Sequence, residues 1–239
     1  MTEKALLVVM FVTLMTSFVQ ADNPLAECLA GKVICIDPGH PSETSAGTRG
    51  KKVTENHVNW VIALTLGKKL EALGASVILT KDIENELMPN RRRAEIANEN
   101  QANLMIRLHC DAGSKSGFRI FYPDRQGKRF GVTGPSFAVI KKSKEIASVF
   151  HHAMNSVLSK YLKSLGVAGD SETYVGNKQG ALTGSIFSAV PVLTIEMCVL
   201  TNPKDERFIS SPKGKALMVK ALLEGSLAVL NPSVKKGRG

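Results

Sequence analysis

The chain has 239 residues, with 31 lysines and arginines against 21 aspartates and glutamates, so its formal net charge is +10 at pH 7. This length suits a single domain with a sizeable core, and the basic charge points to anionic surfaces or polymers as partners. Nucleic acid is disfavoured as a partner, because the sequence lacks the clusters of arginine and aromatic residues that single-strand binders use.

The first 21 residues have the pattern of a signal peptide. Lys4 precedes an uninterrupted apolar and hydroxyl run, Ala5 to Val19, and the segment 19–21 fits a small-residue cleavage site. The run is short for a membrane span, which needs about 20 residues. We therefore expect export with cleavage, to a periplasmic or extracellular location, rather than retention by a membrane anchor. No stable membrane span is expected after cleavage.

The remaining chain is expected to contain a leader segment at 22–31, one folded domain at 32–231 and a basic, flexible tail at 232–239. Strand-like and helix-like segments alternate along this domain. The expected strands are 32–37, 75–81, 103–109, 118–123 and 190–200. The expected helices are 54–73, 91–101, 137–165, 181–188 and 211–230, and a polar, glycine-rich loop spans 124–135. This alternation predicts an α/β fold with one mostly parallel, twisted sheet and helices on both faces.

Polar residues follow or end several of the expected strands. His40 lies just beyond the first strand, His109 ends the third, Glu196 lies within the last, and Glu55 opens the first helix. Functional groups collect at the carboxyl ends of parallel strands, so these four side chains can converge. Two imidazoles and a carboxylate form a common catalytic zinc shell, and a further carboxylate can take a proton from water. A structural role for each histidine remains the alternative on residue types alone.

Four sequence blocks occur in an order that identifies a family. They are VICIDPGH, TENHVNWVIALTLGKKLEALGASVILTKD, RRRAEIANENQANLMIRLHCDAG and VPVLTIEMCVLTNPKDERFI. Together they resemble the zinc-dependent N-acetylmuramoyl-L-alanine amidases, the bacterial cell-wall amidases. The resemblance extends from about Lys32 to Leu230 and is weakest over 122–183.

The resemblance implies one zinc ion held by His40, Glu55 and His109, with Glu196 as the catalytic glutamate. The implied reaction is hydrolysis of the amide between the lactyl group of N-acetylmuramic acid and L-alanine in peptidoglycan stem peptides. A zinc peptidase acting within the stem peptide and a catalytically inactive peptidoglycan-binding protein are the alternatives. The sequence leaves open whether a regulatory protein binds the chain.

This sequence departs from the family pattern at two places beside the implied zinc ligands. Pro41, Ser42 and Glu43 follow DPGH where the family has a second glycine, and Cys110-Asp111 follows His109 where the family has Ala-Asn. The four chemical positions are unaltered, so these departures bear on substrate preference and on tuning of the site.

Further residues near these motifs have two interpretations each. Asp37 could orient His40 or stabilise the turn, and Asp111 is a second candidate for supporting a zinc ligand. The basic loop residues Arg125, Lys128 and Arg129 could contact carboxylates of the stem peptide.

The cysteines admit similar alternatives. Cys35, Cys110 and Cys198 lie in apolar strands, where they could be buried thiols or form disulfides. Strand alternation predicts that Cys110 faces away from His109 and that Cys198 shares a face with Glu196.

Overall fold

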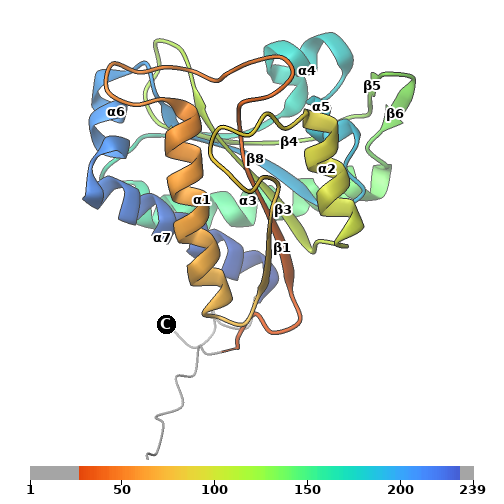
Figure 1. Ribbon diagram of the computed structural model, residues 1–239, viewed down its shortest axis with the longest axis horizontal. Coiled ribbons are helices and arrows are strands. Elements are labelled where there is room, and N and C mark those ends of the chain that lie inside the picture. The colour runs from red at the N-terminus through yellow and green to blue at the C-terminus, as the bar shows by residue number, and fades with distance from the viewer. Residues whose placement is uncertain (1–26, 232–239) are drawn as a thin grey trace, which may run out of the picture.

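The computed structural model describes residues 27–231 (Figure 1). The expected signal peptide, most of the expected leader and the basic tail lie outside these residues. Within the part of the leader that is described, Leu29 is fully buried and its N–H donates to the Leu73 carbonyl. The packed core therefore begins before Lys32. Among residues 27–231, no helix is both long enough and apolar enough to cross a membrane.

A six-stranded sheet forms the centre of the fold, with strand order β2-β1-β3-β8-β4-β7 (Figure 1). Strands β2, β1, β3 and β8 run parallel, β4 is antiparallel to β8, and β7 is parallel to β4. The sheet is therefore mostly parallel, as predicted. Its strands are β1 (Val33–Pro38), β2 (Ser76–Leu79), β3 (Leu104–Asp111), β4 (Phe118–Tyr122), β7 (Ser164–Gly169) and β8 (Val192–Val199).

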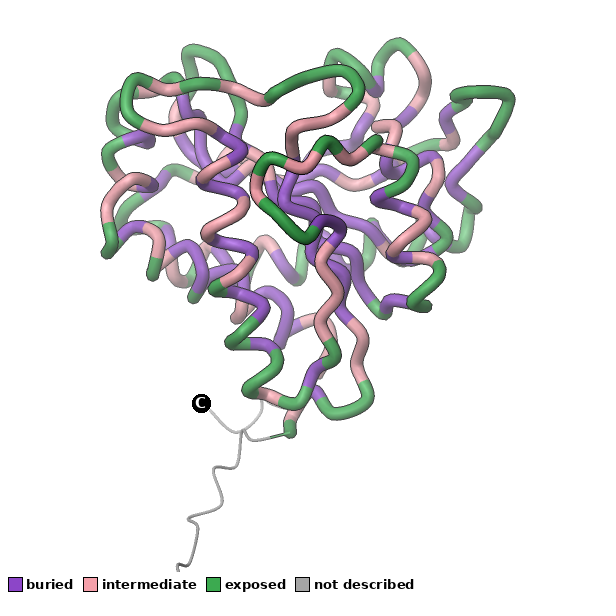
Figure 2. Tube along the Cα trace, viewed as in Figure 1, coloured by how far each residue is buried: buried purple, intermediate pink, exposed green. Residues whose placement is uncertain are grey.

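Helices cover both faces of this sheet. The larger core contains apolar residues of α1 (Glu55–Glu71), α3 (Phe137–Leu158) and α7 (Pro212–Leu230), packed against one face. A smaller core on the other face lies under α2 (Asn90–Glu99). Figure 2 shows the buried residues concentrated along the strands and on the inner sides of the helices. Parallel strands buried on both faces explain the continuous apolar runs in the sequence.

The helix starts follow from side-chain caps. The Thr54 side chain accepts a hydrogen bond from the His57 N–H, so α1 begins at Glu55. The Ser211 side chain likewise accepts from the Gly214 N–H, with Pro212 at the first position of α7. Both helices begin one residue after the expected starts at 54 and 211.

The expected helix 137–165 is too long. Helix α3 ends at Leu158, and residues 164–169 form β7, which pairs with β4. Gly166 has a φ of +83°, which is incompatible with a continuing helix. The strand signal is weak because two of its six residues are glycine, so pairing with β4 decides its structure.

The expected loop 124–135 contains a hairpin instead. Strands β5 (Gly127–Arg129) and β6 (Val132–Gly134) are antiparallel and are joined by Phe130 and Gly131, both with positive φ. Two consecutive positive-φ residues are typical of tight hairpin turns. The sequence interpretation also missed three short helices, namely η1 (Asp170–Glu172), α4 (Tyr174–Gln179) and α6 (Pro203–Ser210), and the expected helix 181–188 is the shorter α5 (Thr183–Ile186).

The cysteine prediction was half correct. Cys110 faces away from His109, but Cys198 lies on the Cys110 side, with the two Sγ atoms 3.8 Å apart. A register shift between β3 and β8 explains this, because His109 pairs with Glu196 while Asp111 pairs with Val199. Cys35, Cys110 and Cys198 are buried thiols, with no disulfide between them in the structure of residues 27–231.

Candidate metal and catalytic site

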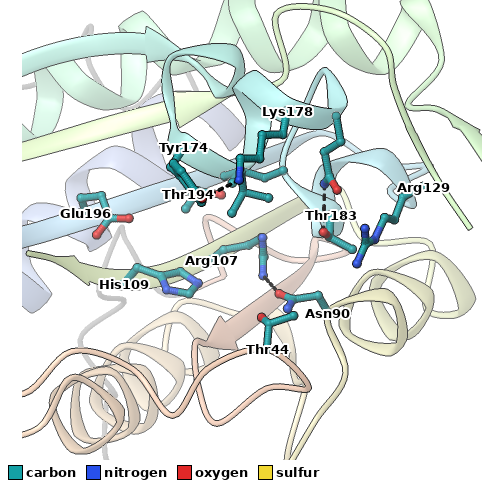
Figure 3. Close-up of a pocket in the computed structure, with 13 residues that line it drawn as sticks. Thr44, Asn90, Arg107, His109, Arg129, Tyr174, Lys178, Thr183, Thr194 and Glu196 are labelled. Atoms are coloured by element: carbon teal, nitrogen blue, oxygen red, sulfur yellow. Dashed lines mark hydrogen bonds between the residues drawn. The ribbon is translucent and has the colours of Figure 1, made fainter.

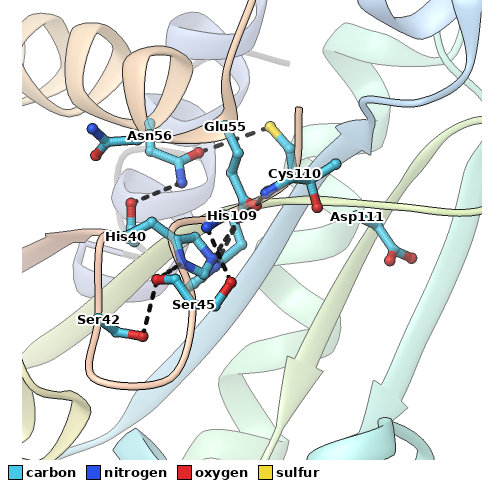
Figure 4. Close-up of polar contacts among 12 residues, drawn as sticks. His40, Ser42, Ser45, Glu55, Asn56, His109, Cys110 and Asp111 are labelled. Atoms are coloured by element: carbon cyan, nitrogen blue, oxygen red, sulfur yellow. Dashed lines mark hydrogen bonds and ion pairs between the residues drawn. The ribbon is translucent and has the colours of Figure 1, made fainter. Parts of the chain in front are cut away.

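Three predicted site residues meet at the carboxyl ends of the parallel strands. His40 follows β1, His109 lies near the end of β3, and Glu55 is the first residue of α1 (Figure 4). Glu55 Oε1 is 3.2 Å from His40 Nε2 and 3.1 Å from His109 Nδ1. One potential ligand atom from each side chain lies within 4.8 Å of the other two.

The backbone at His40 is held in an uncommon conformation. His40 has a φ of +64°, which costs free energy for a residue with a Cβ atom. Buried cations stabilise this turn: Lys81 Nζ donates to the His40 carbonyl, and Arg93 donates to the carbonyls of Pro38 and Pro41 at 2.8 Å each. The imidazole therefore leaves the sheet edge in a direction that the surrounding residues determine.

The loop after His40 is where the sequence departs from the family pattern, and it is tied at two points. The Ser45 carbonyl lies 3.2 Å from His40 Nδ1, and because a carbonyl can only accept, it favours a proton on Nδ1 and a lone pair on Nε2. Glu43 accepts the Asn90 N–H at 2.8 Å, at the start of α2. The acidic residue of this loop thus anchors it to α2.

The Glu55 carboxylate is fixed by backbone donors. Thr48 N donates to Oε2 at 2.6 Å, and Cys110 N donates to Oε1 at 3.0 Å. Burial alone would raise the pKa of Glu55, but hydrogen bonds from His109 and His40 outweigh it and hold the pKa below its ordinary value. The loop just before Glu55 is held in turn by Glu206 of α6, whose Oε1 accepts the Lys52 N–H at 2.5 Å.

The donor set suits one tetrahedral divalent ion. Ligand atoms about 2.0–2.2 Å from a zinc ion lie roughly 3.3–3.6 Å from one another, close to the separations between Glu55 and the two histidines. Burial lowers the pKa of His109, which favours the neutral imidazole that a metal requires. Three protein donors also leave a fourth position open, as in catalytic rather than structural sites.

Glu196 faces the same site from the neighbouring strand. It is the register partner of His109, and its Oε2 is buried with no hydrogen-bond partner in the described chain. Burial first, and then the charges of Glu55 and Asp111, raise its pKa well above the ordinary value. An unpartnered carboxylate with a raised pKa beside an open ligand position is suited to accept a proton.

Asp37 and Asp111 do not contact the histidines. Asp37 is fully buried, and its oxygens accept from Thr80 at 2.6 Å, Arg93 at 2.6 Å and Arg107 at 2.9 Å. The idea that it orients His40 directly is wrong, and its role in stabilising the turn acts through Arg93. Asp111 is exposed and directed away from the imidazoles (Figure 4), and it accepts the Ala112 N–H instead. A register shift after His109 turns it outward.

A cavity of about 380 Å³ begins beside His109 of the candidate metal site (Figure 3). His109 and Glu196 lie at one end, Arg129 lies at the other, and Arg107 and Lys178 lie between them. Of the three basic loop residues singled out in the sequence, only Arg129 lines this cavity. Lys128 is not among the lining residues, and Arg125 contacts Asp124 and Ser171 away from it.

The sequence interpretation missed Arg107 and Lys178. Arg107 could have been found, because it lies two residues before His109 on a strand and therefore shares its face. Lys178 belongs to α4, within the segment where the family resemblance is weakest, and its sequence gives no comparable signal.

Gly39 leaves space for one of the histidines, which gives a first prediction. A Cβ atom at position 39 would lie 2.3 Å from His109 Cε1, so Gly39→Ala must displace this imidazole. We expect Gly39→Ala to weaken zinc binding about 10-fold or more. Competition with a fluorescent chelator measures the dissociation constant. Gly67→Ala is the matched control, since its Cβ atom would make only ordinary contacts with Val77 and Ile36. Equal zinc affinity in the two variants would contradict the prediction.

Two imidazoles and a carboxylate at one point, faced by a second carboxylate, are the arrangement of catalytic divalent-metal sites in hydrolases. Residues 34–227 match the family Amidase_3, N-acetylmuramoyl-L-alanine amidase, and the chain belongs to this family. Membership in it supports a peptidoglycan amidase function.

Several relatives that are named as amidases align with most of this chain. N-acetylmuramoyl-L-alanine amidase Rv3717 of Mycobacterium tuberculosis is 28% identical over 222 residues, covering 82% of this chain and 86% of that protein. The amidase Ami1 from Mycobacterium smegmatis has a similar structure, with a TM-score of 0.70 and 21% identity over 85% of this chain and 99% of that chain. The CwlD amidase of Clostridioides difficile, solved in complex with the GerS lipoprotein, gives a TM-score of 0.65 and 21% identity over 84% of this chain and 99% of that chain.

Proposed function

We propose that this protein is a zinc-dependent amidase. It would hydrolyse the amide between the lactyl group of N-acetylmuramic acid and L-alanine of the peptidoglycan stem peptide. The observation that supports this most directly is the group formed by His40, Glu55 and His109, with Glu196 facing it across one cavity. Family membership supports the choice of bond.

His40 Nε2, a Glu55 carboxylate oxygen and His109 Nδ1 would hold the ion. When bound, zinc supplies a Lewis acid that polarises the scissile carbonyl and lowers the pKa of water toward about 7. Ser45 and the backbone N–H groups of Thr48 and Cys110 keep the donor atoms oriented before the ion arrives.

Glu196 would move the proton. Its unpartnered Oε2 accepts a proton from the attacking water, whose oxygen joins the lactyl carbonyl carbon. The same oxygen then delivers the proton to the L-alanine nitrogen as the carbon–nitrogen bond breaks. The products are a lactyl carboxylate on the sugar and a stem peptide with a free amino terminus.

Location and partners are part of this proposal. The signal-peptide pattern of residues 1–21 and the net charge of +10 support action outside the cytoplasm, at an anionic wall. A regulatory protein partner is also proposed, supported by the structural neighbour solved in complex with a lipoprotein.

One experiment separates this function from its two alternatives. Purified protein is incubated with peptidoglycan, with and without a chelator, and the released products are identified by mass spectrometry. We expect stem peptides with L-alanine at the amino terminus, released by the zinc-loaded protein and not by the chelated one. Shortened peptides still attached to sugar would indicate the peptidase, and wall binding without products would indicate the inactive binding protein.

A further inference from the structure

Arg107 is a buried arginine that shares its one contacting carboxylate with a second arginine. Its side chain is 4% exposed, and Nε donates to Asp37 Oδ2 at 2.9 Å. Arg93 donates to the other oxygen of the same carboxylate at 2.6 Å. Two guanidinium groups therefore share Asp37, the one carboxylate that either of them contacts in the described residues. A buried charge that is incompletely paired favours a further anion.

Hydrogen bonds fix the position of the Arg107 guanidinium, and the residue lines the cavity. A second hydrogen bond, from Nη2 to Asn90 Oδ1 at 2.8 Å, sets the plane of the group (Figure 3). Nη1 has no hydrogen-bond partner among residues 27–231, and Arg107 lines the cavity. Gly184 lies against the guanidinium, since a Cβ atom there would be 2.6 Å from both Cζ and Nη1. The N–H groups of Nη1 therefore keep hydrogen-bonding capacity that a carboxylate in the cavity can use.

Two further cations line the same cavity. Lys178 Nζ lies 4.0 Å from the centre of the Tyr174 ring, and the Arg129 guanidinium lies 4.6 Å from that of Phe130. Neither cation forms an ion pair with a described residue. The cavity lining therefore presents three cations and a single carboxylate, Glu196, which lies beside His109.

The register of β3 and β8 sets how far the backbone of Arg107 lies from the His109–Glu196 pair. Arg107 pairs with Thr194, and His109 pairs with Glu196, so the pairs lie two residues apart on one face. This corresponds to about 6.6 Å along the strands. Thr194 Oγ1 is buried and has no partner in the described chain, so a hydrogen-bonding position stands open beside Arg107.

A stem peptide can span that distance. An extended peptide advances about 3.3–3.6 Å per residue, so a carboxylate on the residue after L-alanine lies within about 7 Å of the scissile nitrogen. If this carboxylate were amidated, the neutral amide would provide no negative charge to pair with Arg107.

We propose that Arg107, assisted by Lys178 and Arg129, forms a subsite that binds a free carboxylate on the residue after L-alanine. The enzyme then selects stem peptides that carry this carboxylate over peptides in which it is amidated. This inference rests on the proposed amidase function.

The test uses two synthetic muramoyl peptides that differ only in a carboxylate or a carboxamide on the residue after L-alanine. We expect kcat/KM of the zinc-loaded protein to be about 10–100-fold higher for the carboxylate, as for a hydrogen bond between charged groups. Arg107→Gln should abolish most of this preference, and Lys178→Gln should reduce it without affecting the buried ion pair. Lys142→Gln, an exposed lysine on α3, is the matched control and should retain the preference.

The outcomes separate the subsite from the proposed function. Equal kcat/KM for both peptides in the unmodified protein overturns the subsite. A loss of activity in Arg107→Gln that is equal for both peptides, with the preference retained, also overturns it, because a merely structural role would act on both alike. If neither peptide is cleaved at the lactyl amide, the proposed function fails, and calorimetric binding of the two peptides then tests the subsite. Tighter binding of the carboxylate supports it, and equal binding overturns it.

Discussion

Glu196→Gln is expected to lower turnover by about 10²–10⁴-fold while zinc remains bound, because glutamine cannot accept the proton from water. Glu196 is not among the three donors that surround the candidate metal position, so ion binding should survive the change. Glutamine has nearly the same size and can occupy the same space on β8. The measurement pairs zinc content, by atomic emission, with the rate at which new amino termini appear on a soluble muramoyl peptide.

The matched control for this variant is Glu145→Gln, an exposed glutamate on α3. It should retain both zinc and turnover. Glu196→Gln with near-normal turnover would remove Glu196 from its assigned role. Loss of zinc together with activity would instead place this carboxylate among the metal ligands.

Asp37→Asn is expected to destabilise the protein by about 3–5 kcal/mol, since it leaves Arg93 and Arg107 buried without their shared carboxylate. The same change should disturb His40, because Arg93 also holds the carbonyls on either side of it. Chemical denaturation of the metal-free protein measures the free energy of unfolding without a contribution from zinc. Asp111→Asn is the control, and a comparable loss there would contradict the argument.

The stability from Asp37 should also depend on pH. Burial alone would raise the pKa of Asp37, but Arg93 and Arg107 outweigh it and hold the pKa below its ordinary value. A depressed pKa means that the folded state binds the proton less readily than the unfolded state. The stabilisation is therefore complete above the unfolded value of about 3.9 and is lost as the pH falls below it. Asp37→Asn should unfold with a weaker dependence on pH in that range, which thermal melts between about pH 2 and 5 would detect.

The central sheet and the convergence of His40, Glu55 and His109 could be predicted because the sequence signals for them are local. Each parallel strand is an apolar run, and His40, His109 and Glu196 lie at or near strand ends whose connectivity places them at one edge. Thr54 marked the start of α1 and hence the position of Glu55.

The features that could not be predicted depend on contacts between residues that are distant in the sequence. Strand β7 is glycine-rich and acquires its structure by pairing with β4, about 45 residues earlier. The face of the sheet on which the Cys198 side chain lies depends on a register shift between β3 and β8, and no pattern within β8 reveals this shift. Asp37 accepts hydrogen bonds from Thr80, directly after β2, from Arg93 of α2 and from Arg107 of β3. Its closeness to His40 in the sequence therefore suggested the wrong contact.

A hydrogen bond of Glu206 connects two segments that are far apart in the sequence. Its carboxylate accepts the N–H of Lys52, 154 positions earlier, and so steadies the loop that leads into Glu55. During synthesis the residues before Glu55 emerge long before α6 does. The loop that positions Glu55 therefore gains this contact only after α6 has been made and folded. In the proposed zinc-dependent function, the ion would bind to a fully supported site only after that step.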